Sequence, residues 1–275
     1  MIIAKGENMS AEKVNLWKEN AKPLHSNDDF FPYLEFYPVK TAKPVGAVMV
    51  CPGGGYAHRA PHEGETIAEE FNKQGIHAFV LHYRVAPNRN PAPLDDARRG
   101  MRLIRSMASK FNVKADKIAV CGFSAGGHLA GSLGIHFDKS NYPAIDSIDK
   151  LSCRPDAMIL CYPVISSGEY RHDGSFKNLL GSEPDSTLME HFSLENHAVS
   201  GVTPPAFMWH TSEDTAVPVE NSLLLASALS RNHIPFELHI YEKGRHGLGL
   251  CPEDSHVASW FRTCTEWLVS MGWKD

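Results

Sequence analysis

Short apolar runs alternate with longer amphipathic stretches along most of this chain, and this alternation constrains its fold more than any other feature. The apolar runs predict strands at 45–51, 76–83, 117–123, 157–162, 206–210 and 236–241. The amphipathic stretches predict helices at 63–73, 94–110, 125–136, 219–232 and 256–271. Strands that alternate with helices form a parallel sheet, and strands without a polar face are covered on both sides. We therefore predict an α/β protein with a mostly parallel central sheet and helices on both faces.

Two further segments depart from this pattern. Residues 33–39 alternate between apolar and polar side chains before a proline-containing turn, which predicts an antiparallel edge strand. Residues 163–203 are polar, contain Gly174 and Pro184, and predict an excursion over the functional face with only short helices, such as 187–191. Because no repeat, low-complexity tract or Pro/Ser-rich linker interrupts the chain, we predict a single domain over residues 1–275.

Composition and charge argue against several classes of function. The 27 basic and 32 acidic side chains give a net charge of −5 without a basic stripe, so no nucleic acid is expected as a partner. Charged residues interrupt positions 1–20 and no run of 18 apolar residues occurs, so we expect a cytoplasmic protein that does not enter a membrane. The six cysteines form no CxxC pair and predict reduced core thiols. The sequence leaves open whether copies of the chain form a homo-oligomer.

The most specific local motif is Gly122-Phe123-Ser124-Ala125-Gly126, which follows an apolar strand and opens a helix. This is the G-x-S-x-G nucleophile elbow, a tight turn that projects a serine hydroxyl from the carboxyl end of a strand. Its glycines allow neighbouring backbone to approach, and the helix N-terminus favours negative charge beside the serine. We predict that Ser124 is a nucleophile. The alternative is a glycine-rich helix start that only packs closely.

A serine nucleophile needs a base within hydrogen-bond distance and a third group that orients the base; after an elbow of this kind these follow in the order Ser, acid, His. Asp214 lies in the loop after the fifth predicted strand and precedes Val217-Pro218 in a D-x-x-V-P pattern, which favours it over the adjacent Glu213 as the acid. His246 lies in a glycine-rich loop after the last strand, where a packing residue is unexpected. We predict that His246 is the base and that Asp214 orients it.

A glycine run, Pro52-Gly53-Gly54-Gly55-Tyr56, follows the first predicted core strand. It occupies the position of the oxyanion loop of lipases and esterases, where glycines let backbone N–H groups point at a developing oxyanion. We predict Gly54, Gly55 and Ala125 as the donors, although the sequence does not decide which of the three glycines contribute. A nucleotide-phosphate loop is the alternative, but neither G-K-[ST] nor a complete G-x-G-x-x-G is present.

Several other polar and aromatic residues have simpler interpretations. The group His58, Arg59, His62 and Glu63 lacks the second histidine of an HExxH site, so no metal is predicted and the stretch is interpreted as a loop before a helix. Asp95 and Asp96 open a predicted helix, where capping and the helix dipole explain them. Four aromatic residues are expected to pack the terminal helix: Trp260, Phe261, Trp267 and Trp273.

These residues together resemble the acetyl xylan esterase-like branch of the α/β-hydrolases, some members of which carry the label endo-1,4-β-xylanase B or sugar hydrolase. The resemblance covers nearly the whole chain after about residue 30 and rests on six segments: Pro52 to Tyr56, Tyr83-Arg84, Gly122 to Leu129, Pro204-Pro205, Asp214 with Val217-Pro218, and Gly244 to Gly247. It implies an α/β-hydrolase fold, cleavage of acetyl or aryl esters, in some members on xylan-type sugars, and no metal or organic cofactor. Pro52 stands where hormone-sensitive-lipase relatives have His, and fewer than 45 residues precede the first core strand, so we expect a small or absent cap.

We therefore expect a serine carboxylesterase that acts on a small ester, chiefly an acetylated sugar or xylo-oligosaccharide, with Tyr56 and His58 beside the substrate. Glycoside cleavage usually requires two carboxylates that flank the bond, which this site does not offer. Two alternatives stay open. A serine peptidase of the prolyl-oligopeptidase type usually has a gating domain, for which this chain is too short. A hydrolase fold that only binds a small molecule would have no use for an intact triad.

Overall fold

Eight strands form one mixed sheet in the computed structural model, which describes residues 11–17, 23–137 and 142–274. Their order across the sheet is β1-β2-β4-β3-β5-β6-β7-β8. The bounds are β1 Glu12–Asn15, β2 Tyr33–Tyr37, β3 Val45–Cys51, β4 His77–His82, β5 Val113–Phe123, β6 Ala157–Cys161, β7 Ala206–Thr211 and β8 Phe236–Tyr241. The two pairings that involve β2 are antiparallel, and the strands from β4 to β8 pair in parallel. The prediction of a mostly parallel sheet is confirmed.

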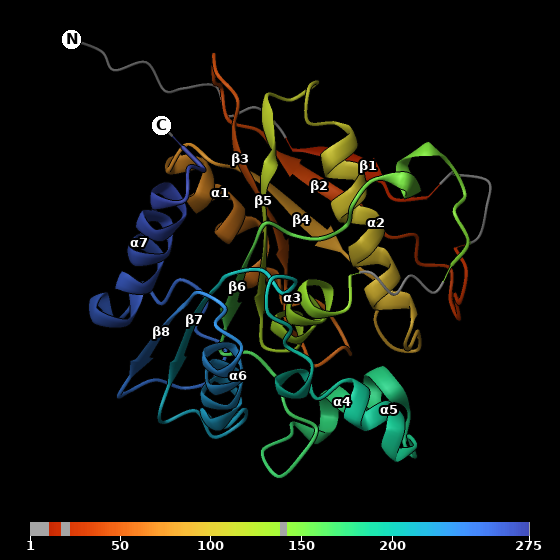
Figure 1. Cartoon of the computed structure of the whole chain (residues 1–275), viewed down its shortest axis with the longest axis vertical. Helices are drawn as coiled ribbons and strands as arrows, with labels where there is room; N and C mark the ends of the chain where they lie inside the picture. Colours follow the sequence, from red (N-terminus) through yellow and green to blue (C-terminus); the bar gives the residue numbers. More distant parts are fainter. Residues whose placement is uncertain (1–10, 18–22, 138–141, 275) are drawn as a thin grey trace.

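Helices cover both faces of this sheet (Figure 1). Their bounds are α1 Glu65–Lys73, α2 Ala92–Ser106, α3 Ala125–Ile135, α4 Asp173–Leu180, α5 Ser186–His191, α6 Glu220–Arg231 and α7 Ser255–Ser270. Helices α2, α3 and α6 pack on one face, and α1 and α7 pack on the other. Successive strand residues point to opposite faces of the sheet. Met49 packs in the core under α2, α3 and α6, while Val48 and Val50 pack in the core under α1 and α7. Apolar side chains on both faces therefore explain why the core strands lack a polar face.

The antiparallel margin of the sheet differs from the prediction. Residues 33–37 form an antiparallel strand as expected, but β1 pairs outside β2, so β2 is not the edge. Strand β1 has the sequence EKVN and only four residues, too few to show a clear alternation, and its pairing depends on the register with β2. Of the N-terminal stretch expected to lack a targeting segment, residues 1–10 and 18–20 lie outside the described residues.

Asp95 and Asp96 bind arginines and do not cap α2. The residue at the helix N-cap is Pro91, without a side-chain cap. Asp96 is completely buried and accepts hydrogen bonds from Arg84 at 2.7 and 2.8 Å, and Asp95 accepts one from Arg98 at 3.2 Å. The capping interpretation is therefore wrong: α2 turns its first acidic residues inward, where a carboxylate needs a cationic partner.

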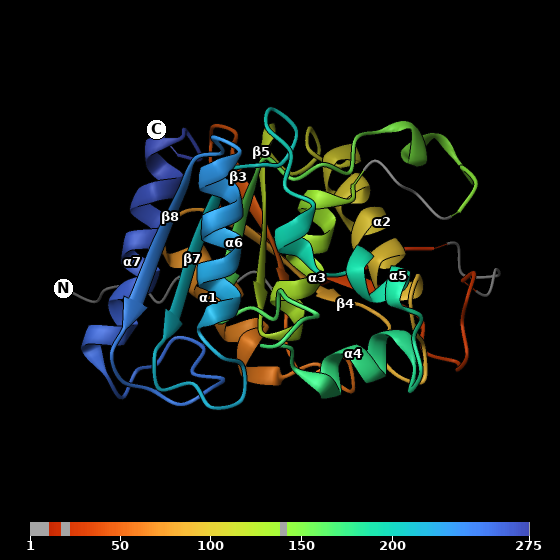
Figure 2. The same ribbon diagram turned by 60° about the horizontal axis from the view of Figure 1, so that its bottom comes forward.

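The polar excursion at 163–203 contains α5, close to the predicted 187–191, and a second short helix, α4, for which no bounds were predicted. Figure 2 shows α4 beyond the arrowhead ends of the strands. The side chain of Asn178 in α4 donates to the carbonyl oxygen of Gly55 at 2.9 Å. The excursion thus contacts the glycine loop at the carboxyl ends of the parallel strands.

Other expectations concern the core and the membrane. Trp260, Phe261 and Trp273 are buried, and Trp267 packs against the same core, which confirms their packing role. All six cysteines are buried and free. Within the described part of the chain, no helix is long and apolar enough to span a bilayer, and no three His, Cys, Asp or Glu residues gather as metal ligands would.

Candidate active site

Ser124 lies in a strained turn between β5 and α3. Its φ of 54° and ψ of −120° belong to a region that residues other than glycine rarely adopt. A Cβ on Gly122 would lie 2.0 Å from the carbonyl oxygen of Gly126, and a Cβ on Gly126 would lie 2.1 Å from that of Cys51. Both glycines of the motif are therefore required by backbone packing. The turn they permit places Ser124 at the carboxyl end of β5.

The structure brings the three predicted triad residues into one chain of hydrogen bonds. The Oγ atom of Ser124 lies 2.8 Å from Nε2 of His246, and Nδ1 of His246 lies 2.6 Å from Oδ2 of Asp214. Asp214 follows β7 and His246 follows β8, and these strands are parallel neighbours, so their loops meet at the same end of the sheet. The distances allow His246 to take the Ser124 proton while Asp214 holds the imidazole.

The surroundings of Asp214 keep its side chain ionised. Oδ1 accepts hydrogen bonds from the N–H groups of Ala216 and Val217 at 3.0 and 2.9 Å, and Nε2 of His210 lies 3.3 Å from Oδ2. Burial alone would raise the pKa of this carboxyl. The hydrogen bonds with His210 and His246, the charge of His246 and the backbone N–H of Val217 together lower the pKa well below its usual range. Asp214 can therefore stabilise a positive charge on His246.

Glu213, the alternative acid, points elsewhere. It is exposed, and its carboxylate accepts a hydrogen bond from the N–H of Gly244 at 3.3 Å. The structure thus places Asp214, and not Glu213, against His246.

The glycine loop lies directly beside Ser124. A Cβ on Gly53 would lie 3.0 Å from Cβ of Ser124, and Gly54 and Gly55 have φ values of 116° and 63°. The N–H of Gly53 donates to Oε2 of Glu63 at 2.8 Å, whereas the N–H groups of Gly54 and Gly55 have no acceptor among the described residues. Ala125 is the first residue of α3, where an N–H has no partner within the helix. This geometry suits Gly54, Gly55 and Ala125 as oxyanion donors, and that role stays a prediction.

The structure separates the two residues predicted to contact substrate. Tyr56 is 1% exposed, and its hydroxyl lies 2.9 Å from Nδ1 of His128. Because the ring is buried, the side chain of Tyr56 offers no surface to a substrate in this structure. This corrects the prediction for Tyr56. His58 is exposed, and its contact with substrate stays a prediction.

Three buried polar residues around the triad were not predicted from sequence: His210, Tyr162 and Glu63. His210 is held beneath Asp214 by a hydrogen bond between its Nδ1 and the Ser222 hydroxyl at 2.8 Å. The ring of Tyr162 packs edge-on against that of His246, with centroids 5.1 Å apart. The available signal was weak: His210 and Tyr162 are polar residues at the ends of apolar strands, and Glu63 ends a short 3₁₀ turn two residues before α1 begins.

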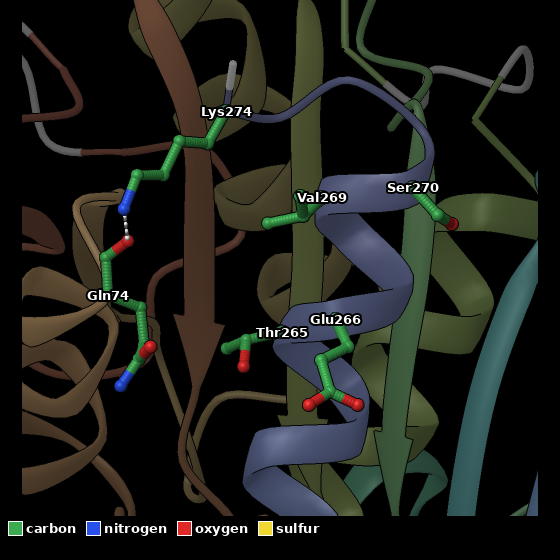
Figure 3. A pocket seen from close by; sticks show the side chains of 6 residues that line it. All are labelled: Gln74, Thr265, Glu266, Val269, Ser270 and Lys274. Carbon is green, nitrogen blue, oxygen red and sulfur yellow. Dashed lines mark hydrogen bonds between the residues drawn. The ribbon is translucent and has the colours of Figure 1, made fainter.

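Two surface hollows lie apart from these residues. One has a volume of about 330 Å³ and is lined by α7, Gln74 and Lys274 (Figure 3). The Nζ atom of Lys274 donates to the carbonyl oxygen of Gln74 at 3.1 Å. The neighbouring Trp273 bonds to Gly46 at the start of β3, so this hollow lies at the amino ends of the parallel strands, opposite Ser124. The second, of about 450 Å³, is lined by Asp185 and three residues of α5. No triad residue lines either hollow, so neither is the candidate site.

Comparisons with known proteins show which proteins this chain is similar to. The BD-FAE family profile matches residues 34–229. The chain is 42% identical to endo-1,4-β-xylanase B of Butyrivibrio fibrisolvens and 33% identical to an acetylxylan esterase of Xylanibacter ruminicola, over 90% and 82% of its own length. It spans only 39% and 44% of those two relatives.

A solved structure covers the chain more completely. An acetyl ester-xyloside bifunctional hydrolase from Caldicellulosiruptor lactoaceticus is 47% identical, with a TM-score of 0.93, and the match covers 98% of this chain and 100% of that one. The fold is also shared with other solved α/β-hydrolases and carboxylesterases. The predicted fold class is therefore confirmed.

Proposed function

Because the chain belongs to the BD-FAE family of α/β-hydrolases, we propose that it is a serine carboxylesterase that removes short acyl groups, chiefly acetyl, from sugars or xylo-oligosaccharides. The observation that supports this most directly is the continuous hydrogen-bonded chain from Ser124 through His246 to Asp214. The names of its relatives, an acetylxylan esterase and an acetyl ester-xyloside hydrolase, support the substrate class.

Acylation begins when His246 takes the proton of the Ser124 hydroxyl through Nε2. The Ser124 oxygen attacks the ester carbonyl and forms a tetrahedral intermediate with a negative oxygen. The free N–H groups of the glycine loop and of Ala125 would stabilise that oxygen. His246 then protonates the leaving sugar hydroxyl, and the C–O bond to the sugar breaks to leave an acetyl-serine.

Deacylation repeats these steps with water. His246 takes a proton from the water, whose oxygen attacks the acetyl carbonyl. The second tetrahedral intermediate collapses as His246 returns the proton to Ser124, and acetate leaves. Asp214 stabilises the imidazolium in both halves of the cycle because it stays ionised beside Nδ1.

Ester cleavage suits this site better than glycoside cleavage. A glycosidase needs one carboxyl group to protonate the leaving oxygen and a second carboxylate on the other side of the bond. Here both oxygens of Asp214 accept hydrogen bonds from protein groups, as do both oxygens of Glu63. Neither carboxylate is available for that role.

Three measurements test the proposal. A fluorophosphonate should label the protein, and Ser124→Ala should abolish both labelling and turnover. p-Nitrophenyl acetate should be hydrolysed faster than the butyrate and longer esters. Acetylated xylo-oligosaccharides and sugar acetates should release acetate.

Each alternative gives a different result. Absence of labelling in folded protein would favour a non-catalytic binding protein. Faster cleavage of prolyl peptides than of esters would favour a peptidase, and rates that rise with acyl length would contradict the short-acyl preference. The cytoplasmic location and the single-domain organisation stay predictions.

A further inference from the structure

Glu63, the last residue of the 3₁₀ turn η1 (Pro61–Glu63), is a buried carboxylate without a part in the steps above. It is 2% exposed, and both of its oxygens are used: Oε2 accepts from the N–H of Gly53 at 2.8 Å, and Oε1 accepts from the hydroxyl of Tyr162 at 2.7 Å. Its ion-pair contact in the described part of the chain is the exposed His62, at 3.7 Å. Burial of a carboxylate without Lys or Arg is unfavourable unless its hydrogen bonds are made, so these two bonds hold Glu63 in place.

One oxygen of Glu63 binds the glycine loop. Gly53 is the first glycine of that loop and lies against Ser124, where a Cβ would come within 3.0 Å of the serine Cβ. When Glu63 accepts the Gly53 N–H, it fixes the orientation of this peptide. The following N–H groups, of Gly54 and Gly55, are left free for a developing oxyanion.

The other oxygen reaches the loop that carries the catalytic base. The Tyr162 hydroxyl donates to Glu63 and accepts from the N–H of Gly249 at 2.8 Å, and the Tyr162 ring packs against the ring of His246. The neighbouring His62 contacts the same loop, since its Nε2 lies 3.0 Å from the carbonyl oxygen of Gly247.

We propose that Glu63 is a positioning residue for ester hydrolysis, because one carboxylate holds the glycine loop through Gly53 and the His246 loop through Tyr162. We call Glu63, Gly53 and Tyr162 the Glu63 clamp. It keeps the oxyanion donors and the base at a fixed spacing on either side of Ser124. This inference rests on the proposed function and adds to it a residue outside the triad. The clamp positions the N–H donors of the glycine loop and His246, which stabilise the transition state more than they bind the substrate. Loss of the clamp therefore lowers kcat and leaves KM nearly unchanged.

Two substitutions remove different parts of the clamp. Gln has the shape of Glu, but its amide has only one acceptor oxygen. If the amide NH₂ faces Gly53 in Glu63→Gln, two N–H donors oppose each other. If the NH₂ faces Tyr162 instead, the Tyr162 hydroxyl must turn and loses the acceptor for its own proton. Tyr162→Phe removes the hydroxyl and keeps the ring on His246. Asp95→Asn is the matched control, because Asp95 is equally buried and binds Arg98 in α2 rather than a group of the site.

The experiment measures kcat and KM for p-nitrophenyl acetate, affinity for a trifluoromethyl ketone, and the thermal unfolding midpoint. The ketone forms a serine adduct that carries an oxyanion, so it reports the oxyanion site. In Glu63→Gln we expect kcat to fall about 30-fold or more, KM to stay within about twofold, and ketone affinity to weaken in parallel with kcat. In Tyr162→Phe we expect a fall in kcat of roughly tenfold. Asp95→Asn should unfold at a lower temperature and keep kcat within about twofold.

The outcomes separate this inference from the proposed function. If the parent protein hydrolyses no ester, the proposed function fails and the clamp fails with it. If the parent is active and folded Glu63→Gln keeps kcat within about threefold, or raises KM instead, the positioning role alone is overturned. If Glu63→Gln does not fold, Tyr162→Phe decides, and a parental kcat in that variant overturns the proposal. A fall in kcat in Asp95→Asn equal to that in Glu63→Gln would also overturn it.

Discussion

Replacing Asp214 with Asn tests how much of the turnover depends on a carboxylate behind His246. His246 becomes positive when it takes the Ser124 proton, and its Nδ1 lies 2.6 Å from the fully buried Asp214 side chain. Two unit charges roughly 4 Å apart attract by about 4 kcal/mol at an effective dielectric constant of about 20, which corresponds to roughly a thousandfold in rate. The Asn amide can also donate to Nδ1, which favours a tautomer whose Nε2 cannot accept the serine proton. We therefore expect kcat to fall by about 10³ to 10⁴.

The adjacent Glu213 provides the control. Its side chain is exposed and bonds only the N–H of Gly244 among the described residues, so Glu213→Gln should keep kcat within about twofold. Both variants are assayed with p-nitrophenyl acetate near neutral pH, and thermal unfolding confirms that each is folded. The reasoning is refuted if folded Asp214→Asn loses less than about tenfold in kcat, or if Glu213→Gln loses as much as Asp214→Asn.

Three further substitutions test the surrounding structure. Gly126→Ala would bring a Cβ to 2.1 Å from the carbonyl oxygen of Cys51 and push the glycine loop away from the nucleophile, so we expect kcat for p-nitrophenyl acetate to fall about a hundredfold; an unchanged kcat would contradict this. Burial lowers the pKa of His128 from 6.5 to about 4, so between these pH values the histidine is protonated in the unfolded chain and neutral in the folded one. The free energy of unfolding therefore falls by roughly 3 kcal/mol as the pH drops through this interval. Urea unfolding at pH 7 and pH 5 should show a smaller drop in the free energy of unfolding for His128→Gln than for the parent, and an equal drop would show that His128 is not the cause. Asp96→Asn leaves the buried Arg84 without its counter-charge and should lower the free energy of unfolding by about 3 to 5 kcal/mol in chemical denaturation, whereas a change below about 1 kcal/mol would argue against the pair.

Several features could be predicted from sequence because they depend on short stretches of chain. The strand predicted at 45–51 has the same bounds in the structure. A uniformly apolar run between turn residues is stable where both of its faces are buried, as in a sheet covered by helices. The elbow was predictable because the turn at Ser124 requires Gly122 and Gly126, and these residues lie within a motif of five. Asp214 and His246 were predictable because their loops follow strands, and parallel strands bring such loops to one end of the sheet.

Other features depend on contacts between residues that are distant in the chain. Strand β1 exists through its register with β2, and its own four residues carry no clear pattern. Tyr56 follows the glycine loop and was expected to face the substrate, but its side chain is buried and its hydroxyl lies against His128, 72 residues away.

The sequence by itself therefore determined the layered α/β architecture, and it predicted as a triad the three residues that the structure joins by hydrogen bonds. Hydrophobic periodicity and tight-turn chemistry are local properties, so a single sequence displays them. Only the tertiary structure decided which N–H groups beside Ser124 are free and which buried carboxylate holds the loops. Glu63 meets Gly53 across ten residues and Tyr162 across 99, and a pairing over such separations arises only when the folded backbone brings a buried acceptor to its donors.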